Sequence, residues 1–222
     1  MIAENIQQIT RELPAGVRLV AVSKFHPAAA IEEAYAAGQR IFGESRMQEL
    51  VAKYEALPKD IQWHFIGHLQ TNKVRHILPC VTLIESIDSP RLLREVNRQA
   101  AEAGRTVDVL LQLHIAQEET KFGFDCAECR EFLTEGSWRE LNAVRICGVM
   151  GMASNTDNQK QVQHEFATLH AFFQEIKADF FADREYFKEV SMGMSHDYKL
   201  AIAEGSTLVR VGSKIFGERN YH

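Results

Sequence analysis

Short apolar runs alternate with longer amphipathic segments along the chain, and this alternation constrains the fold more than any other feature of the sequence. The runs are rich in β-branched residues. Several lack the polar alternation of a half-exposed strand, which is typical of strands covered on both faces. They occupy residues 18–23, 40–42, 62–66, 81–84, 107–113, 144–150, 187–190 and 207–211. The pattern predicts eight short, buried strands.

The segments between the runs contain signals for the beginnings and ends of helices. Proline is favoured at the first helical position, and glycine just after the last one. Serine before such a proline is a favoured N-cap. On these signals, helices are predicted between Pro27 and Gly38, between Ser89 and Gly104, over 158–178 and over 195–204.

Strict alternation of strand and helix predicts a (β/α)8 barrel. The chain has 222 residues, which gives about 28 residues for each of eight strand–helix units, enough for two short loops as well. We therefore expect one domain over residues 1–222. The alternative is a doubly wound open sheet, but the first strand ends in Ser23-Lys24 and not in a glycine-rich phosphate loop.

Composition excludes several classes of partner. Lysine and arginine total 25 against 30 acidic residues, a formal net charge of −5, whereas nucleic-acid and anionic-membrane binders are usually basic. No apolar run approaches the roughly 18 residues that span a bilayer, and the first residues lack a secretory signal pattern. The sequence predicts a cytoplasmic protein that binds neither nucleic acid nor membrane.

The four cysteines do not form a recognisable framework. Cys126 and Cys129 make a C-x-x-C pattern, which occurs in zinc sites and in redox pairs. Cys80 and Cys147 are isolated, so a second ligand pair is missing. We expect ordinary helix cysteines.

Lys24 occupies the position where barrel enzymes place their chemistry, the carboxyl end of a strand. A lysine at the mouth of an apolar barrel is partly desolvated, which disfavours the ammonium form and leaves an amine able to react with a carbonyl compound. The alternative is a loop lysine whose ammonium group reaches solvent.

The last two strands end in the segments SMGMS (191–195) and RVGS (210–213). Glycines let backbone N–H groups approach an anion closely, and barrels frequently bind phosphate after these two strands. A phosphate site across from a nucleophilic lysine suggests a phosphorylated aldehyde, for which pyridoxal 5′-phosphate (PLP) is the obvious candidate.

Motifs along the chain identify a family. They are AVSK (21–24), IFGES (41–45), WHFIGHLQTNK (63–73), ESIDS (85–89), KFGF (121–124), GVMGMAS (148–154), SMGMSHDY (191–198) and VRVGSKIFGER (209–219). With these motifs the chain resembles the pyridoxal phosphate homeostasis proteins, which are alanine-racemase-like barrels without the second β domain. The match runs from about residue 6 to residue 219.

The resemblance implies a set of cofactor-binding residues. Lys24 would hold PLP as a Schiff base, and Arg210 would lie near the cofactor. The phosphate would be bound by Ser191, Met192, Gly193, Gly212 and Ser213. Two positions depart from the family pattern, since Ser45 replaces a frequent asparagine and Ser213 a frequent threonine.

Other residues offer secondary hypotheses. His64 and His68 have a spacing that binds zinc on a helix, but here a strand end and a glycine separate them. Lys73, Lys121 and Lys214 lie near the expected mouth, where they are either solvated charges or transient acceptors of the cofactor during transfer.

The functional prediction is a monomeric carrier of PLP that maintains vitamin B6 homeostasis and passes the cofactor to apo-enzymes, without efficient catalysis. A racemase needs a base on each face of the cofactor, and the expected single barrel leaves no room for a second domain to supply one. The alternative is an amino-acid racemase or lyase that uses Tyr198 or Tyr221 as its second base. A phosphate-binding barrel enzyme without PLP is a third possibility.

Overall fold

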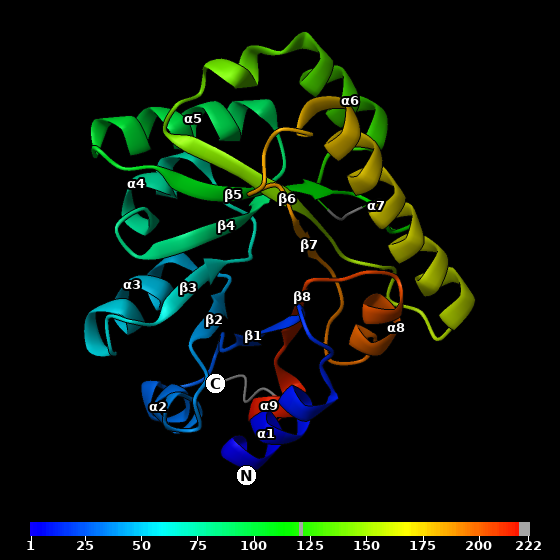
Figure 1. Cartoon of the computed structure of the whole chain (residues 1–222). Helices are drawn as coiled ribbons and strands as arrows, with labels where there is room; N and C mark the ends of the chain where they lie inside the picture. The colour runs from blue at the N-terminus through cyan, green and yellow to red at the C-terminus, as the bar shows by residue number, and fades with distance from the viewer. Residues whose placement is uncertain (120–121, 218–222) are drawn as a thin grey trace.

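The computed structural model describes residues 1–119 and 122–217, and within them eight parallel strands close into a barrel (Figure 1). The strands are β1 (Arg18–Val22), β2 (Ile41–Glu44), β3 (Gln62–Phe65), β4 (Val81–Ile87), β5 (Val107–Leu113), β6 (Val144–Gly151), β7 (Glu189–Ser191) and β8 (Leu208–Val211). Each pairs with its sequence neighbour, and β1 also pairs with β8, with Leu19 opposite Val209. The predicted barrel is confirmed, and the open sheet is excluded.

Helices surround the barrel (Figure 1). They are α1 (Ile2–Glu12), α2 (Ala28–Ala36), α3 (Met47–Ala56), α4 (Val74–Ile77), α5 (Pro90–Glu102), α6 (Cys126–Glu135), α7 (Gln159–Phe180), α8 (Tyr198–Ala203) and α9 (Ser213–Phe216), with short 3-10 turns at Thr71–Lys73 and Ser137–Glu140. Pro90 begins α5 and the Ser89 hydroxyl accepts from the Leu92 N–H, as predicted. Helix α8 begins later than predicted, because Asp197 instead caps the Met194 N–H in a turn.

Apolar side chains form two separate regions. The larger one lies between the barrel and the helices, and includes Phe42, Trp63, Phe166 and Phe187. The smaller one consists of Val20, Leu83, Leu110, Cys147, Met150 and Leu208. The barrel is therefore lined by fewer apolar side chains than the helix–strand layer.

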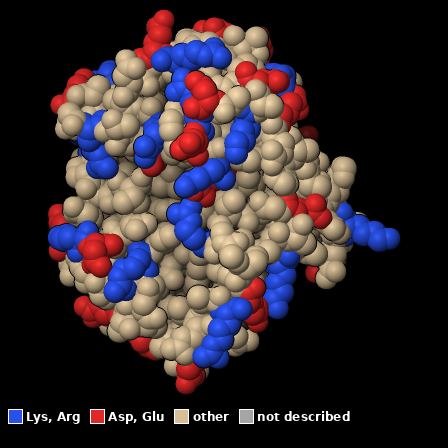
Figure 2. All heavy atoms as spheres, in the orientation of Figure 1, with Lys and Arg blue, Asp and Glu red and all other residues tan. Residues whose placement is uncertain are grey.

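None of the described helices is long and apolar enough to cross a membrane. In the view of Figure 2, basic and acidic side chains are intermixed over the face that is drawn, and neither sign covers it. This distribution agrees with the small net charge of the sequence.

Gly148 lies where strands β6 and β7 approach each other closely. It lies where the pairing of β6 with β5 shifts register, its φ is +153°, and an added Cβ would lie 1.8 Å from the Glu189 carbonyl oxygen. Gly148→Ala is expected to lower the free energy of unfolding by about 2–4 kcal/mol, from backbone strain and overpacking together. Gly16→Ala is the control, because its φ is +89° but nothing lies within 4 Å of the added Cβ. Equal losses in the two variants, measured by urea denaturation, would contradict this account.

Candidate functional site

Lys24 lies two residues after the end of β1 and is half-buried. The backbone is held on both sides of it. The Lys53 Nζ donates to the Ser23 carbonyl oxygen at 2.9 Å, and the Phe25 N–H donates to the Glu49 Oε2 at 2.8 Å. Phe25 has a φ of +67°, a left-handed conformation that a bulky residue adopts only when its surroundings impose it. Lys24 thus projects from a fixed backbone.

The clamp on this backbone is a buried charge cluster. Lys53 donates to the Glu44 Oε1 at 2.7 Å and to the Glu49 Oε2 at 3.1 Å, and the Ser23 hydroxyl donates to Glu44 at 2.6 Å. Burial raises the pKa of Glu44, against the effect of Lys53. Burial also acts to raise the pKa of Glu49, but the Phe25 N–H and Lys53 hold it below its ordinary value. Sequence reasoning did not single out Lys53 or Glu49; their i,i+4 spacing on α3 was the only signal.

A second charged group lies inside the barrel, where Glu85 of β4 is fully buried. Its Oε1 lies 2.6 Å from the His64 Nδ1, and its Oε2 accepts from the Ser191 hydroxyl at 2.5 Å. The Arg210 guanidinium donates to the same hydroxyl at 2.6 Å and to the Gly151 carbonyl oxygen at 3.0 Å. Arg210 also lies 3.8 Å from Glu85. This chain of polar side chains comes from the four strands β3, β4, β7 and β8, and the Gly151 carbonyl adds a fifth, β6.

The charges of this chain compensate one another. Burial would raise the pKa of Glu85, but His64, Arg210 and Ser191 together hold it below its ordinary value. Burial lowers the pKa of Arg210, and Glu85 opposes that shift. Because a guanidinium keeps its proton in proteins, the pair is a carboxylate beside a cation.

The residues predicted to bind the phosphate at the end of β7 lie mostly in the protein interior. Ser191 and Met192 are fully buried, and the Ser191 hydroxyl already donates to Glu85 and accepts from Arg210. The Met192 side chain packs in the outer apolar region. Gly193 has a φ of +96°, and a Cβ there would lie 2.6 Å from the Ala201 Cβ. Only glycine permits this approach of α8.

The residues predicted after β8 lie at the same end of the barrel as Lys24. An added Cβ on Gly212 would lie 3.2 Å from the Val22 carbonyl oxygen, which places this glycine over the end of β1. The Gly212 N–H donates to the Ser195 hydroxyl at 3.1 Å. Ser213 begins α9, so its N–H has no acceptor within that helix. The structure thus brings Lys24 and the β8 loop together.

The secondary candidates are dispersed. His64 is inside the barrel, whereas the His68 ring is 40% exposed, bonds Asp88 at 3.0 Å and stacks on Phe122. No group of three or more potential metal ligands occurs among the described residues. The Lys214 Nζ lies 4.9 Å from the centre of the Tyr198 ring. Lys121 and Tyr221 are outside the described residues.

The C-x-x-C cysteines lie on α6, where Asp125 and Glu128 form a capping box. Burial raises the pKa of the Cys129 thiol to about 12. Burial also raises the pKa of the Cys126 thiol. A redox-active pair needs a thiolate, so these shifts oppose that role.

Tyr198, the proposed second base of a racemase, is engaged elsewhere. It is buried, and its hydroxyl donates to the Glu12 Oε2 at 2.6 Å. Burial and this hydrogen bond raise the pKa of Tyr198 to about 12. A phenol in this state is a poor proton shuttle near neutral pH.

The buried pair predicts a specific pattern of stability. Arg210→Met leaves the Glu85 carboxylate without its cation and is expected to lower the free energy of unfolding by about 3–5 kcal/mol. Adding Glu85→Gln to this variant removes the uncompensated charge, so the double variant is expected to lose less than Arg210→Met alone. Urea denaturation of the single and double variants measures both. Additive losses would contradict the pairing of the two charges.

The chain matches the family model of the alanine racemase N-terminal domain over residues 1–220. It is 37% identical to the pyridoxal phosphate homeostasis protein of Aquifex aeolicus, over 99% of this chain and 96% of that protein. It is 38% identical to the protein of the same name from Schizosaccharomyces pombe, over 99% of this chain and 90% of that protein.

Solved structures give the same picture. PipY of Synechococcus elongatus is 41% identical to this chain, and the match spans 98% of this chain and 100% of PipY. The TM-score is 0.92 for the PipY structure without PLP and 0.88 for the structure with PLP bound. An alanine racemase of Clostridium difficile, 13% identical, covers 99% of this chain and 57% of its own at a TM-score of 0.80, and shares the fold.

Proposed function

The chain belongs to the family of the alanine racemase N-terminal domain and, within it, to the pyridoxal phosphate homeostasis proteins, and we propose that it binds PLP through Lys24 and maintains the intracellular supply of this form of vitamin B6. The proposed unit is one barrel domain over residues 1–222, acting as a monomer in the cytoplasm. Its proposed partners are apo forms of PLP-dependent enzymes, and neither nucleic acid nor membrane.

The observation that supports this function best is the clamped backbone around Lys24. Lys53 and Glu49 hold the carbonyl before the lysine and the N–H after it, so the amine starts from a defined position at the mouth. A preorganised nucleophile loses less conformational entropy when it forms a bond.

The residues at this end of the barrel fit a phosphorylated aldehyde. Gly193 and Gly212 are close-approach positions that a Cβ would fill, and the Ser213 N–H begins a helix. We propose that the backbones of the two loops, with the Ser213 hydroxyl, hold the phosphate. The Ser191 hydroxyl is committed to Glu85 and Arg210, so Ser191 and Met192 would contribute main-chain atoms.

Arg210 has a positioning role in this proposal. Its guanidinium is held by Ser191 and Gly151 and its charge is compensated by Glu85. Its backbone N–H donates to the Gly193 carbonyl oxygen at 2.9 Å. Arg210 thereby fixes the β7 loop beside the proposed phosphate position.

When bound, PLP supplies an aldehyde that an uncharged lysine amine can attack. The chain's own residues then hold and orient the cofactor, and we propose that they do little more. The Tyr198 hydroxyl is bonded to Glu12 and has a raised pKa, so it offers no second base. The relatives at 37% and 38% identity are likewise named for homeostasis and not for a catalysed reaction.

Lys24→Ala is expected to abolish covalent attachment of PLP. Wild-type protein incubated with PLP should show a visible absorbance band that borohydride reduces to a stable adduct, and Lys24→Ala should show neither, because the reacting amine is absent. Lys73→Ala, which removes another lysine of the carboxyl end, is the control and should retain both. The spectrum and the intact mass after reduction are the measurements.

Two results would overturn the proposal. Absence of the band in the wild-type protein would favour a barrel that binds phosphate without PLP. Racemisation of L-amino acids by the purified protein, well above the rate of free PLP and dependent on Lys24, would favour the racemase alternative.

Glu49→Ala tests the clamp. It removes the acceptor of the Phe25 N–H, and is expected to weaken PLP binding by about tenfold, the equivalent of one charge-assisted hydrogen bond. Glu55→Ala is a matched control, because Glu55 is exposed on the same helix. Spectroscopic titration with PLP gives the two dissociation constants. Equal values for the two variants would show that Lys24 does not depend on the clamp.

A further inference from the structure

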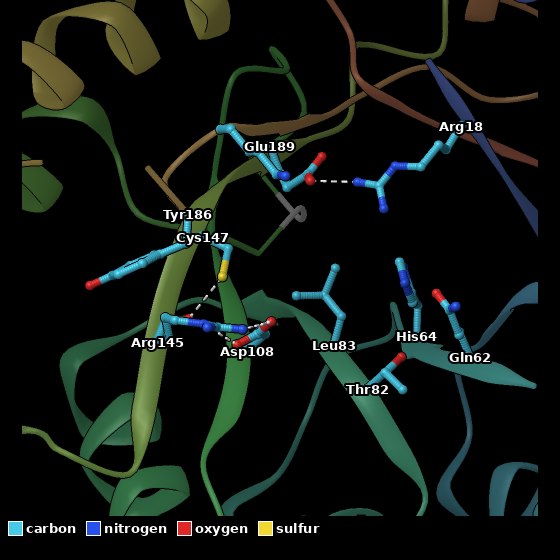
Figure 3. Close-up of a pocket in the computed structure, with 11 residues that line it drawn as sticks. Arg18, Gln62, His64, Thr82, Leu83, Asp108, Arg145, Cys147, Tyr186 and Glu189 are labelled. Carbon is cyan, nitrogen blue, oxygen red and sulfur yellow. Dashed lines mark hydrogen bonds and ion pairs between the residues drawn. The ribbon is translucent and has the colours of Figure 1, made fainter. Parts of the chain in front are cut away.

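A cavity of about 390 Å³ lies at the end of the barrel opposite Lys24 (Figure 3). Most of its lining residues lie at the beginnings of strands, whereas Lys24 follows the end of β1. The lining residues are Arg18, Gln62, His64, Thr82, Leu83, Asp108, Arg145, Cys147, Tyr186, Lys188 and Glu189.

The carboxylates of this cavity are already satisfied by the protein. Arg145 donates to both oxygens of Asp108, at 2.7 and 2.8 Å. Glu189 accepts from Arg18 and, at 2.7 Å, from the Thr207 hydroxyl. Neither acid therefore needs a cation from a ligand.

Hydrogen-bond donors remain directed into the cavity. One terminal nitrogen of Arg18 bonds Glu189, and the other points into the open space beside His64 (Figure 3). The Gln62 side chain lies next to the His64 ring in the same view. Lys188 is exposed at the rim and adds a positive charge that neither carboxylate of the cavity balances. Donors from β1 and β3, with a cation before β7, favour an anion with several oxygens.

The other wall is apolar and aromatic. Leu83 and Cys147 belong to the small apolar region inside the barrel, and Tyr186 packs against it. The Arg145 guanidinium lies 5.4 Å from the centre of the Tyr186 ring, which holds the aromatic side chain in place. This wall suits the apolar body of an organic ligand more than it suits a bare inorganic ion.

His64 connects the cavity to the opposite end of the barrel. It is 4% exposed, and its Nδ1 bonds Glu85, which in turn binds Ser191, the acceptor of Arg210. Its Nε2 has no hydrogen-bond partner among residues 1–119 and 122–217. A ring nitrogen without a hydrogen-bond partner in the protein, on a residue that lines a cavity, is a group that a ligand can bond.

We propose that this cavity is a second ligand site, for a small organic phosphate monoester, and that its occupancy is sensed at the Lys24 end through His64, Glu85, Ser191 and Arg210. The binding part stands on the cavity alone, and the sensing part rests on the proposed function. A protonated ligand oxygen that donates to the His64 Nε2 polarises the ring and strengthens the hydrogen bond from its Nδ1–H to Glu85. That change weakens the hold of Glu85 on Ser191 and Arg210. By linkage, PLP affects the second ligand to the same degree.

The binding part is tested by calorimetric titration of the full chain with phenyl phosphate, inorganic phosphate and benzoate. The protein is titrated both alone and after PLP has been fixed on Lys24 by borohydride reduction and the excess removed, which blocks the phosphate position near Lys24 and leaves the cavity open. Phenyl phosphate is expected to bind in both states and more tightly than the other two probes.

Three variants locate the site. Arg18→Gln and Lys188→Gln are each expected to weaken phenyl phosphate binding by about tenfold, and Lys160→Gln, exposed at the beginning of α7, should leave it unchanged. Lys188 is exposed, so its variant stays informative if Arg18→Gln, which unpairs Glu189, fails to fold. Absence of binding in the wild-type protein, or unchanged binding in the Lys188 variant, would overturn the site.

The sensing part has its own measurement. Saturating phenyl phosphate is expected to change the dissociation constant of PLP severalfold in the wild-type protein. His64→Asn keeps a donor for Glu85 but lacks the second ring nitrogen, and is expected to abolish that change. An unchanged PLP affinity despite bound phenyl phosphate would overturn the sensing and leave the site. Failure of PLP to bind at all would overturn the proposed function, while the variant titrations without PLP would still decide the site.

Discussion

The carboxylate of Glu85 inside the barrel is the constraint on which the rest of the structure depends. A buried charge is tolerated only when paired and hydrogen-bonded, so partners had to be supplied from several strands. His64 of β3, Ser191 of β7 and Arg210 of β8 fill that role. Strand β7 pairs with β8 at a single register position, Ser191 opposite Leu208. The bond from Arg210 to Ser191 therefore closes the barrel where the backbone ladder is thinnest, and it also ties together the loops that follow both strands.

A second cluster of charged side chains holds the backbone around Lys24, as the partners of Glu85 hold the strands of the barrel. Lys53 lies between Glu44 and Glu49, and its third partner is the carbonyl that precedes Lys24. The cluster links β2 and α3 to the end of β1 through side chains. These contacts hold the turn at Phe25 in a conformation that local propensity does not favour. The backbone around Lys24 is thus held by charged side chains, and their hydrogen bonds offset the strain in the turn at Phe25.

The sequence was sufficient for the barrel because strand and helix periodicities are local signals. The same holds for Lys24, whose position at the end of a strand follows from the run before it. The Glu85–Arg210 pair could not be predicted in this way, because the two residues lie far apart in the chain. Strand register decides whether their side chains point into the barrel, and the sequence alone does not give that register. The motif predicts Ser191 at the phosphate, but it does not show what the Ser191 hydroxyl bonds. Its hydroxyl is used inside the barrel, a fact that only the neighbouring strands determine.

The hydrogen bonds between these ionisable side chains limit the proton transfers that the site can perform. Among the described residues, Glu49 is bonded to Lys53, Glu85 is bonded to His64 and Ser191, and the hydroxyl of Tyr198 is bonded to Glu12. A catalyst that moves protons on and off a substrate needs groups whose protonation can change at little cost. A group whose charge is compensated by a buried partner resists such change, because each protonation step leaves the partner uncompensated. The same pairing that fixes these side chains therefore makes them poor acids and bases for catalysis.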